Sequence, residues 1–386
     1  MVEFIYLDHA ATTPAYTGVV KAMQKALQEV FGNPSSPHSF GLEAERLVNR
    51  SRTAVAESIG AEPGEIYFTS GGTEADNLAI RGTLQAKRRQ GSHVIASAVE
   101  HDAVLETLRH LQELGVCEYT LIVPDEEGLI SPKAVAAAVR EDTVLVTVML
   151  INNEVGTIQP VEEVVNRVKA ENPEIYCHSD AAQALGKMSF RVNDLGVDLL
   201  TLSGHKLGGP KGVGSLFCRK GVRLISQNTG GGQENGLRSG TENVPAIAGF
   251  GEAVTTAVGD MRLNLENWRR CQSHLMELVK TIPDTAVHGT PLTMAPHIVN
   301  MGFPGIRGEI LVHALAEKGI FVSTGAACSS RKQITSHVLD AMGVVPLLAE
   351  GSIRISFGAE TTVEEIDILA GLLKQTVGEL RSFQRN

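Results

Sequence analysis

Short apolar segments alternate with amphipathic ones through the middle of the chain, from about residue 65 to residue 217. One of the helical patterns covers residues 161–170, and the strand-like runs are 66–69, 94–97, 120–123, 144–151, 175–178, 199–203 and 214–218. This alternation predicts a mostly parallel sheet with helices on both faces. Because ligands bind at the carboxyl ends of the strands in such sheets, the residues that follow these runs are candidates for chemistry.

The remainder of the chain has a different pattern. A long amphipathic segment covers about residues 253–281 and could bridge two domains. Beyond it, a smaller α+β unit is expected, with strands at 298–301, 320–322 and 353–356 and helices at 308–318, 337–342 and 363–381. A chain of 386 residues is long enough for two such units, each with a core.

Composition excludes several classes of protein. The formal net charge of −10 argues against non-specific binding to nucleic acid. The acidic N-terminal residues and the lack of a long apolar run predict neither a secretory signal nor a membrane span. Five scattered cysteines without a CxxC pair indicate neither a disulfide framework nor a zinc site, so we expect a reducing, cytoplasmic setting.

Two charged residues follow buried strand-like runs. Lys206 comes after the run 199–203 and is followed by glycines, so its amine can lie at a cleft and form a Schiff base. Asp180 comes after the run 175–178. Pyridoxal phosphate needs such a pair, because the lysine carries its aldehyde and the aspartate keeps its pyridine nitrogen protonated. Alone, Lys206 would more simply be a solvated surface lysine.

Three further polar positions lie at strand ends. Gly72 and Thr73 stand between the run 66–69 and a helical pattern, which predicts an anion site at a helix N-terminus or a helix cap without a ligand. His101 could cover a ring face and shuttle protons, or be an ordinary loop histidine. The amide of Asn153 could bind a carboxylate or a ring hydroxyl, or form an Asx turn.

Three features lie later in the chain. The glycine-rich segment 230–243 carries polar residues suited to phosphate or carboxylate contact. Arg354 interrupts an apolar strand, where a guanidinium could bind a substrate carboxylate or pair with a structural acid. Cys328 lies among small and polar residues, so its thiol is a nucleophile candidate. We expect the other four cysteines to be ordinary buried residues.

Together these motifs resemble the cysteine desulfurases of the NifS/IscS type, within the fold-type I pyridoxal phosphate enzymes. The matching segments are 6–14, 32–36, 69–77, 100–101, 152–154, 180–183, 203–214, 230–243, 328–330 and 354–358. The resemblance implies an α/β fold: a large domain, residues 15–258, with a mostly parallel seven-stranded sheet, and a smaller α+β domain. Residues 1–14 and 259–386 would form the small domain and carry a mobile cysteine loop at about 323–336.

The resemblance implies a role for each residue around the cofactor. Lys206 would be the Schiff-base lysine, Asp180 would pair with the pyridinium nitrogen, and Gln183 would bind the ring hydroxyl. His101 would stack on the ring and move protons. The residues that would hold the cofactor phosphate are Gly72, Thr73, Ser203 and His205.

The resemblance also implies the substrate contacts and the partners. Asn153, which also contacts the cofactor, and Arg354 would hold the carboxylate of L-cysteine. Thr241 would reach the phosphate in the neighbouring subunit, which implies a homodimer. Cys328 would accept the sulfur as a persulfide for acceptors such as an iron–sulfur scaffold or a tRNA-thiolation protein.

Some alternatives stay open on sequence grounds. No metal is required, although Cys328 is a candidate transient ligand of an iron–sulfur cluster. The opening motif has His9 where the family more usually has asparagine, which affects the substrate side of the cleft. A selenocysteine lyase shares the scaffold and the cysteine, an aminotransferase-like enzyme would need no mobile cysteine, and a non-catalytic sulfur-assembly scaffold would need no intact Lys206.

Overall fold

A seven-stranded sheet forms the centre of the larger part of the molecule. The computed structural model describes residues 4–324 and 336–383. Across the sheet the strands lie in the order β2 (Ile66–Thr69), β8 (Gly214–Cys218), β7 (Leu199–Ser203), β6 (Tyr176–Asp180), β5 (Thr143–Thr147), β3 (His93–Ser97) and β4 (Glu118–Ile122). β8 runs antiparallel to both neighbours, and the other adjacent pairs are parallel. The predicted mostly parallel seven-stranded sheet is confirmed.

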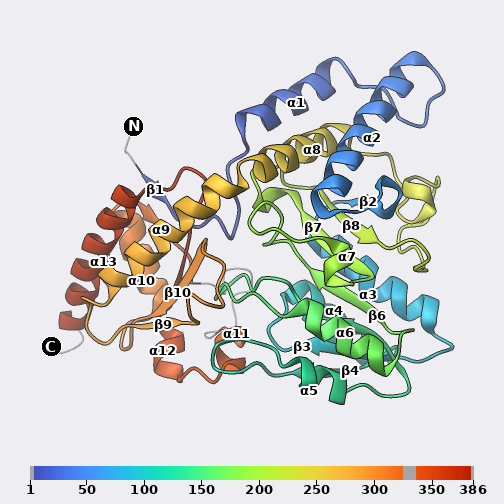
Figure 1. Cartoon of the computed structure of the whole chain (residues 1–386). Helices are drawn as coiled ribbons and strands as arrows, with labels where there is room; N and C mark the ends of the chain where they lie inside the picture. The colour runs from blue at the N-terminus through green and yellow to red at the C-terminus, as the bar shows by residue number, and fades with distance from the viewer. Residues whose placement is uncertain (1–3, 325–335, 384–386) are drawn as a thin grey trace.

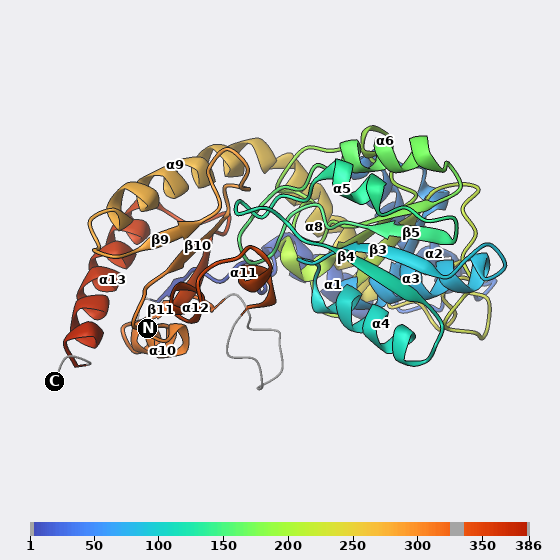
Figure 2. The same ribbon diagram turned by 90° about the horizontal axis from the view of Figure 1, so that it is seen from below.

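Helices cover both faces of this sheet, as Figure 2 shows for α4 and α6. One face packs against α3 (Gly72–Lys87) and α4 (Asp102–Glu113), and the other against α5 (Pro132–Ala137), α6 (Val161–Glu171) and α7 (Val192–Leu195). α6 buries Val161, Val164, Val165 and Val168, which share one helical face. Two glutamates in its first turn are favourable beside the positive end of the helix dipole.

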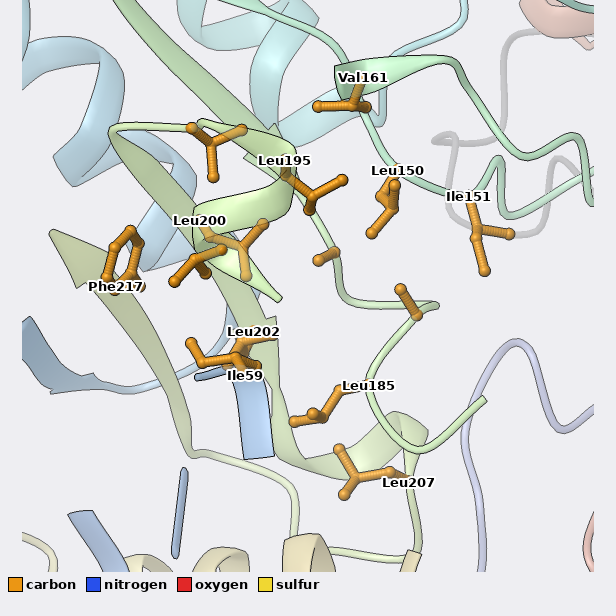
Figure 3. Close-up of a cluster of buried hydrophobic side chains, with 14 of the residues drawn as sticks. Ile59, Leu150, Ile151, Val161, Leu185, Leu195, Leu200, Leu202, Leu207 and Phe217 are labelled. Atoms are coloured by element: carbon orange, nitrogen blue, oxygen red, sulfur yellow. The ribbon is translucent and has the colours of Figure 1, made fainter. Parts of the chain in front are cut away.

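The largest apolar cluster among the described residues lies on the face of the sheet that α5, α6 and α7 cover, and it extends into the loops that follow the strands. Its labelled members in Figure 3 include Leu200 and Leu202 of β7, Phe217 of β8, and Leu185 and Leu207 from the loops after β6 and β7. All five side chains are buried. Burying one leucine side chain stabilises a fold by about 2 kcal/mol, so this cluster fixes the loops that follow the strands.

Three long helices extend this larger part. α1 (Thr17–Gln28) and α2 (Ser39–Ile59) both pack on α8 (Val244–Gly259). Figure 1 shows α8 leading into α9 (Met261–Val279), which belongs to the smaller part. None of the helices in the described part of the chain is long and apolar enough to cross a lipid bilayer.

The smaller part is built on short sheets with a core of their own (Figure 1). β10 (Ile298–Gly302) lies between β9 (Ala286–His288) and β12 (Ser352–Ser356), antiparallel to both. β1 (Ile5–Tyr6) pairs in parallel with β11 (Ile320–Phe321). The remaining helices are α10 (Gly308–Glu317), α11 (His337–Ala341), α12 (Pro346–Glu350) and α13 (Val363–Phe383).

The structure corrects three details of the predicted elements. The segment 253–281 is not one helix, because α8 and α9 are separate helices that meet at Asp260, whose N–H bonds back to Thr256. β5 ends at Thr147 rather than at residue 151. The Val148 and Leu150 N–H groups beyond it still donate to the His178 and Asp180 carbonyls of β6. β9 was not predicted, because three residues are too few to show alternation.

The predicted domain boundaries stay a prediction. α11 and α12 fall in the range that we assigned to the small domain, yet Val338, Leu339 and Ala349 belong to the apolar cluster of the larger part. The boundary between the cores of the larger and smaller parts therefore does not fall at one position in the sequence, because the chain returns to the larger core after residue 336.

Candidate active site

A cavity of about 230 Å³, here called the strand-end cavity, lies at the carboxyl ends of the parallel strands. Ten residues that the sequence analysis assigned to cofactor or substrate line it: Gly72, Thr73, His101, Asn153, Asp180, Gln183, Ser203, His205, Lys206 and Arg354. They are spread along the chain from Gly72 to Arg354. Of the predicted site residues that the structure describes, all except Thr241 line this cavity.

Lys206 ends a short 3₁₀ turn directly after β7. Gly208, two residues on, has φ +79°, and a Cβ there would lie 2.2 Å from the Tyr16 ring, so the turn requires glycine. The Lys206 Nζ donates to the carbonyl oxygens of Ala10 at 2.7 Å and Ala11 at 2.9 Å. The N-terminal segment therefore holds the amine at the cavity wall.

Asp180 ends β6 and lies across the same cavity. Its Oδ1 accepts the Ala182 N–H at 2.8 Å. Burial raises the pKa of Asp180, and the charges of His101 and Lys206 oppose that rise. Asp76 is buried beside it, and its Oδ1 has no hydrogen-bond partner among the described residues. Burial first, and the Asp180 charge second, raise the pKa of Asp76 well above its ordinary value.

These groups fit pyridoxal phosphate. An amine, a buried carboxylate and a helix N-terminus face one cavity, and they match the aldehyde, the pyridine nitrogen and the phosphate of that cofactor. A Cβ at Gly72 would lie 3.6 Å from the Thr201 methyl group and 3.7 Å from the Ser203 Cβ. It would thus take up space at the start of α3, where an anion would approach the free N–H groups.

His101 caps the N-terminus of α4, and its Nδ1 accepts the Ala103 N–H at 3.1 Å. In the neutral ring the proton therefore lies on Nε2. The adjacent Glu100 is buried, and its Oε1 accepts the Ser97 hydroxyl at 2.5 Å and the Met149 N–H at 2.7 Å. Burial raises the pKa of Glu100 to about 8, so this side chain is largely neutral at pH 7.

Arg354 lies on β12 and is 3% exposed. Its Nη1 donates to the Asn153 carbonyl at 2.8 Å and its Nη2 to Asp8 Oδ1 at 2.8 Å. The guanidinium therefore pairs with an acid and also lines the strand-end cavity. The Asx turn belongs to Asn152, whose Oδ1 accepts two backbone N–H groups, and Asn153 lines the cavity beside it.

Thr241 lies at a different cavity of about 160 Å³, here called the Thr241 cavity. Thr69, Ser70 and Arg238 also line it. Arg238, in the glycine-rich segment, donates to Glu74 at 2.8 Å. Within one chain the structure does not bring Thr241 to the cavity that Lys206 lines.

Cys328 lies outside the described residues, but the chain on both sides of it is described. Ser323 exchanges two backbone hydrogen bonds with Arg354, at 2.6 and 3.1 Å. On the other side the Ser336 hydroxyl donates to Glu154 at 2.5 Å, and the His337 ring lies 3.0 Å from the Glu100 carbonyl oxygen. Both flanks are therefore held by residues that line the strand-end cavity or adjoin its lining residues.

Sequence reasoning missed part of this site. A second cavity of about 220 Å³, here called the Trp268 cavity, is lined by Lys206 together with His9, Lys187, Asn264 and Trp268. Lys187 is buried, and its Nζ donates to Gln183 Oε1 at 3.0 Å. The available signal was a lysine four residues beyond Gln183 in an otherwise apolar turn. The four described cysteines are buried, as predicted.

Comparison with known proteins supports the resemblance. The aminotransferase class-V family matches residues 5–369. Cysteine desulfurase IscS of Methanosarcina thermophila is 43% identical over 379 residues, which is 98% of this chain and 93% of that protein. A solved NifS-like protein has a TM-score of 0.92 at 37% identity, covering 97% of this chain and 100% of its own. The structure of SspA in complex with cysteine has a TM-score of 0.81 at 35% identity, covering 92% and 98%.

Proposed function

This chain belongs to the aminotransferase class-V family, and from that premise we propose that it is a cysteine desulfurase that binds pyridoxal phosphate in the strand-end cavity. It would convert L-cysteine to L-alanine and leave the sulfur on Cys328. The acceptor would be another protein, such as an iron–sulfur scaffold. The convergence of Lys206, Asp180 and the start of α3 on one cavity is the observation that carries this proposal.

The cofactor would supply an electron sink that stabilises negative charge at the substrate Cα. Lys206 would hold it covalently and Asp180 would keep its pyridine nitrogen protonated. Gln183 would bind the ring hydroxyl. The phosphate would lie against Gly72, Thr73, Ser203 and His205, where the first N–H groups of α3 are free of helical partners.

Arg354 and Asn153 would orient the substrate carboxylate. His101 would cover the ring and move a proton through Nε2, since its Nδ1 already accepts the Ala103 N–H. The Cys328 sulfur would attack the substrate sulfur, forming an S–S bond as the substrate C–S bond breaks. The thiol proton balances the proton that the three-carbon product takes up, so cysteine and a thiol give alanine and a persulfide.

The position of Cys328 along the chain supports its role. Thr324 is the last described residue before it, next to Ser323, which pairs with Arg354. Cys328 follows Thr324 by four residues, a reach of about 14 Å when extended, and this stretch begins beside a residue paired with Arg354, which lines the strand-end cavity.

Replacing the thiol tests the proposal. Cys328→Ala should still change the cofactor absorbance on adding cysteine, because Lys206, Asp180 and Arg354 remain. Persulfide and alanine formation should stop, because a methyl group cannot attack sulfur. Cys117→Ala is the matched control, since that thiol is buried elsewhere. Normal alanine formation by Cys328→Ala would exclude the proposed nucleophile, and activity on selenocysteine alone would favour the lyase.

We also propose a homodimer in which Thr241 completes the phosphate site of the partner subunit. Thr241 lies beside Thr69 and Ser70, which precede the start of α3, but at a separate cavity. Mixing inactive Lys206→Ala with inactive Thr241→Glu should restore activity on subunit exchange, since one site of each heterodimer carries neither change. Confirmed exchange without activity would contradict the shared site.

A further inference from the structure

Lys187 has a contact that none of the roles above explains. It is buried, and its Nζ donates to Gln183 Oε1 at 3.0 Å. The Gln183 Nε2 donates to the Ala10 carbonyl at 2.9 Å, and the same carbonyl accepts the Lys206 Nζ at 2.7 Å. One chain of hydrogen bonds thus runs from Lys187 through Gln183 and Ala10 to Lys206.

This series of hydrogen bonds fixes the orientation of the Gln183 amide, with its oxygen and its nitrogen facing different neighbours. A carbonyl only accepts hydrogen bonds, so Ala10 selects the amide nitrogen, and the amide oxygen then faces the Lys187 amine, which donates to it. Nε2 has two N–H bonds and Ala10 takes one. The other N–H is the group that Gln183, which lines the strand-end cavity, can offer there.

Burying Lys187 costs stability. Burial first, and then the charges of Lys206 and Arg354, lower the pKa of Lys187 to about 7. The titratable rings of His9, His205 and His297 also lie within range of its charge. An apolar side chain of similar length would avoid these penalties. A buried amine among cationic neighbours is therefore poorly explained by a purely structural role.

We propose that Lys187 is a positioning residue that holds the Gln183 amide with its free N–H directed at the ring hydroxyl of the cofactor. This inference rests on the proposed function. Without Lys187 only the Ala10 carbonyl orients the amide, so its free N–H is less well aligned with the hydroxyl oxygen, at a cost of up to about 1 kcal/mol.

The test measures binding of pyridoxine 5′-phosphate to the apoprotein by calorimetry. This probe keeps the ring hydroxyl and the phosphate but lacks the aldehyde, so Lys206 cannot bind it covalently. Lys187→Met should weaken its affinity about fivefold. The melting temperature of the apoprotein should be unchanged or higher, which a structural lysine would not allow. Lys187→Arg, which keeps a donor, should restore the affinity.

Lys87→Met is the matched control. Lys87 is also buried and donates to a glutamine, Gln90 Oε1, at 3.0 Å, but it lines neither the strand-end cavity nor the Trp268 cavity. This variant should bind the probe as the unmodified protein does. An equal loss of affinity in Lys87→Met and Lys187→Met would overturn the inference.

A double-mutant cycle shows whether Lys187 acts through Gln183. In a Gln183→Ala background, Lys187→Met should have little further effect on affinity. The same fivefold loss in both backgrounds, or no loss in either, would overturn the inference. Failure of the unmodified apoprotein to bind the probe would instead contradict the proposed function, so the two failures are distinguishable.

Discussion

Two cavities meet at Lys206 and differ in how the chain builds them. The strand-end cavity is lined mainly by residues directly after strands or at the start of a helix. The Trp268 cavity is lined by segments that lie far apart in the sequence, from His9 to Glu360. Both linings bring distant segments together, but only the strand-end cavity is lined mainly by strand-end and helix-start positions that can be recognised in the sequence.

The charges of the two cavities differ as well. The strand-end cavity contains Asp180 and Arg354, whose charges match a cofactor and a substrate carboxylate. In the Trp268 cavity, burial lowers the pKa of His9 to about 4, and Trp268 Nε1 donates to the Gly358 carbonyl at 2.7 Å. We infer that the strand-end cavity binds the reacting molecules, whereas the residues around the Trp268 cavity pack the N-terminal segment against the smaller part.

Replacing the shared lysine should have the largest effect. Lys206→Ala should reduce alanine formation to the uncatalysed background, because it removes the amine that holds the cofactor. Borohydride reduction followed by mass spectrometry should find no cofactor attached to the variant. Lys211→Ala, a control that removes a lysine whose Nζ donates to the Thr13 carbonyl at 3.2 Å, should stay active. Cofactor fixed to Lys211 in the Lys206→Ala variant would show that the assignment is wrong.

A change confined to the strand-end cavity should have an intermediate effect. Arg354→Lys keeps the positive charge but loses the paired N–H donors of the guanidinium. One charge-assisted hydrogen bond is worth about 1.5–3 kcal/mol. We therefore expect KM for cysteine to rise about 10- to 100-fold in steady-state assays. Arg52→Lys is the control, because it loses a similar pair of hydrogen bonds, to Glu234, away from this cavity. It should leave KM unchanged. An equal KM in both variants would show that Arg354 does not bind the substrate.

A change confined to the Trp268 cavity should have the smallest effect on activity and should act on stability instead. The pKa of His9 is about 4 in the fold and 6.5 ordinarily, so the unfolded chain binds the extra proton first as pH falls. The part of the free energy of unfolding that depends on neutral His9 is therefore lost as pH falls from 6.5 to 4. His9→Asn cannot titrate and should lose about 3 kcal/mol less over this window, measured by denaturant unfolding. Identical pH profiles would contradict this, and activity at pH 8 is the control.

The sequence allowed the polar side of the site to be predicted because its residues follow strands within a few positions. Asp180, Lys206 and the start of α3 needed only strand assignment and known strand-end chemistry. The carbonyls of Ala10 and Ala11 could not be found in this way, because any residue type carries the same backbone oxygen. Lys187 was missed for a related reason, since its importance depends on a neighbour that only the folded turn provides.

The fold was predictable to a similar degree. Helices and strands with a sustained period were located correctly, whereas the short strand β9 was missed. The division of the segment 253–281 was missed because Gly259 and Asp260 interrupt the helix without breaking its apolar periodicity. Thr241 lies away from the strand-end cavity in a single chain, so its predicted role depends on a second subunit that one sequence does not display.

The N-terminal segment has a consequence for the order in which the protein is made. The Ala10 N–H bonds to Ser356 Oγ at 2.8 Å, and the Ala10 carbonyl accepts the Lys206 amine. The first of these contacts joins residues that are synthesised near the beginning and near the end of translation. The ribosome therefore releases β1 long before β11 and Ser356 are synthesised. The Lys206 amine can form its contact with a fixed Ala10 only when the last tenth of the chain has emerged. Nascent chains should consequently acquire cofactor late, after the central sheet has already folded.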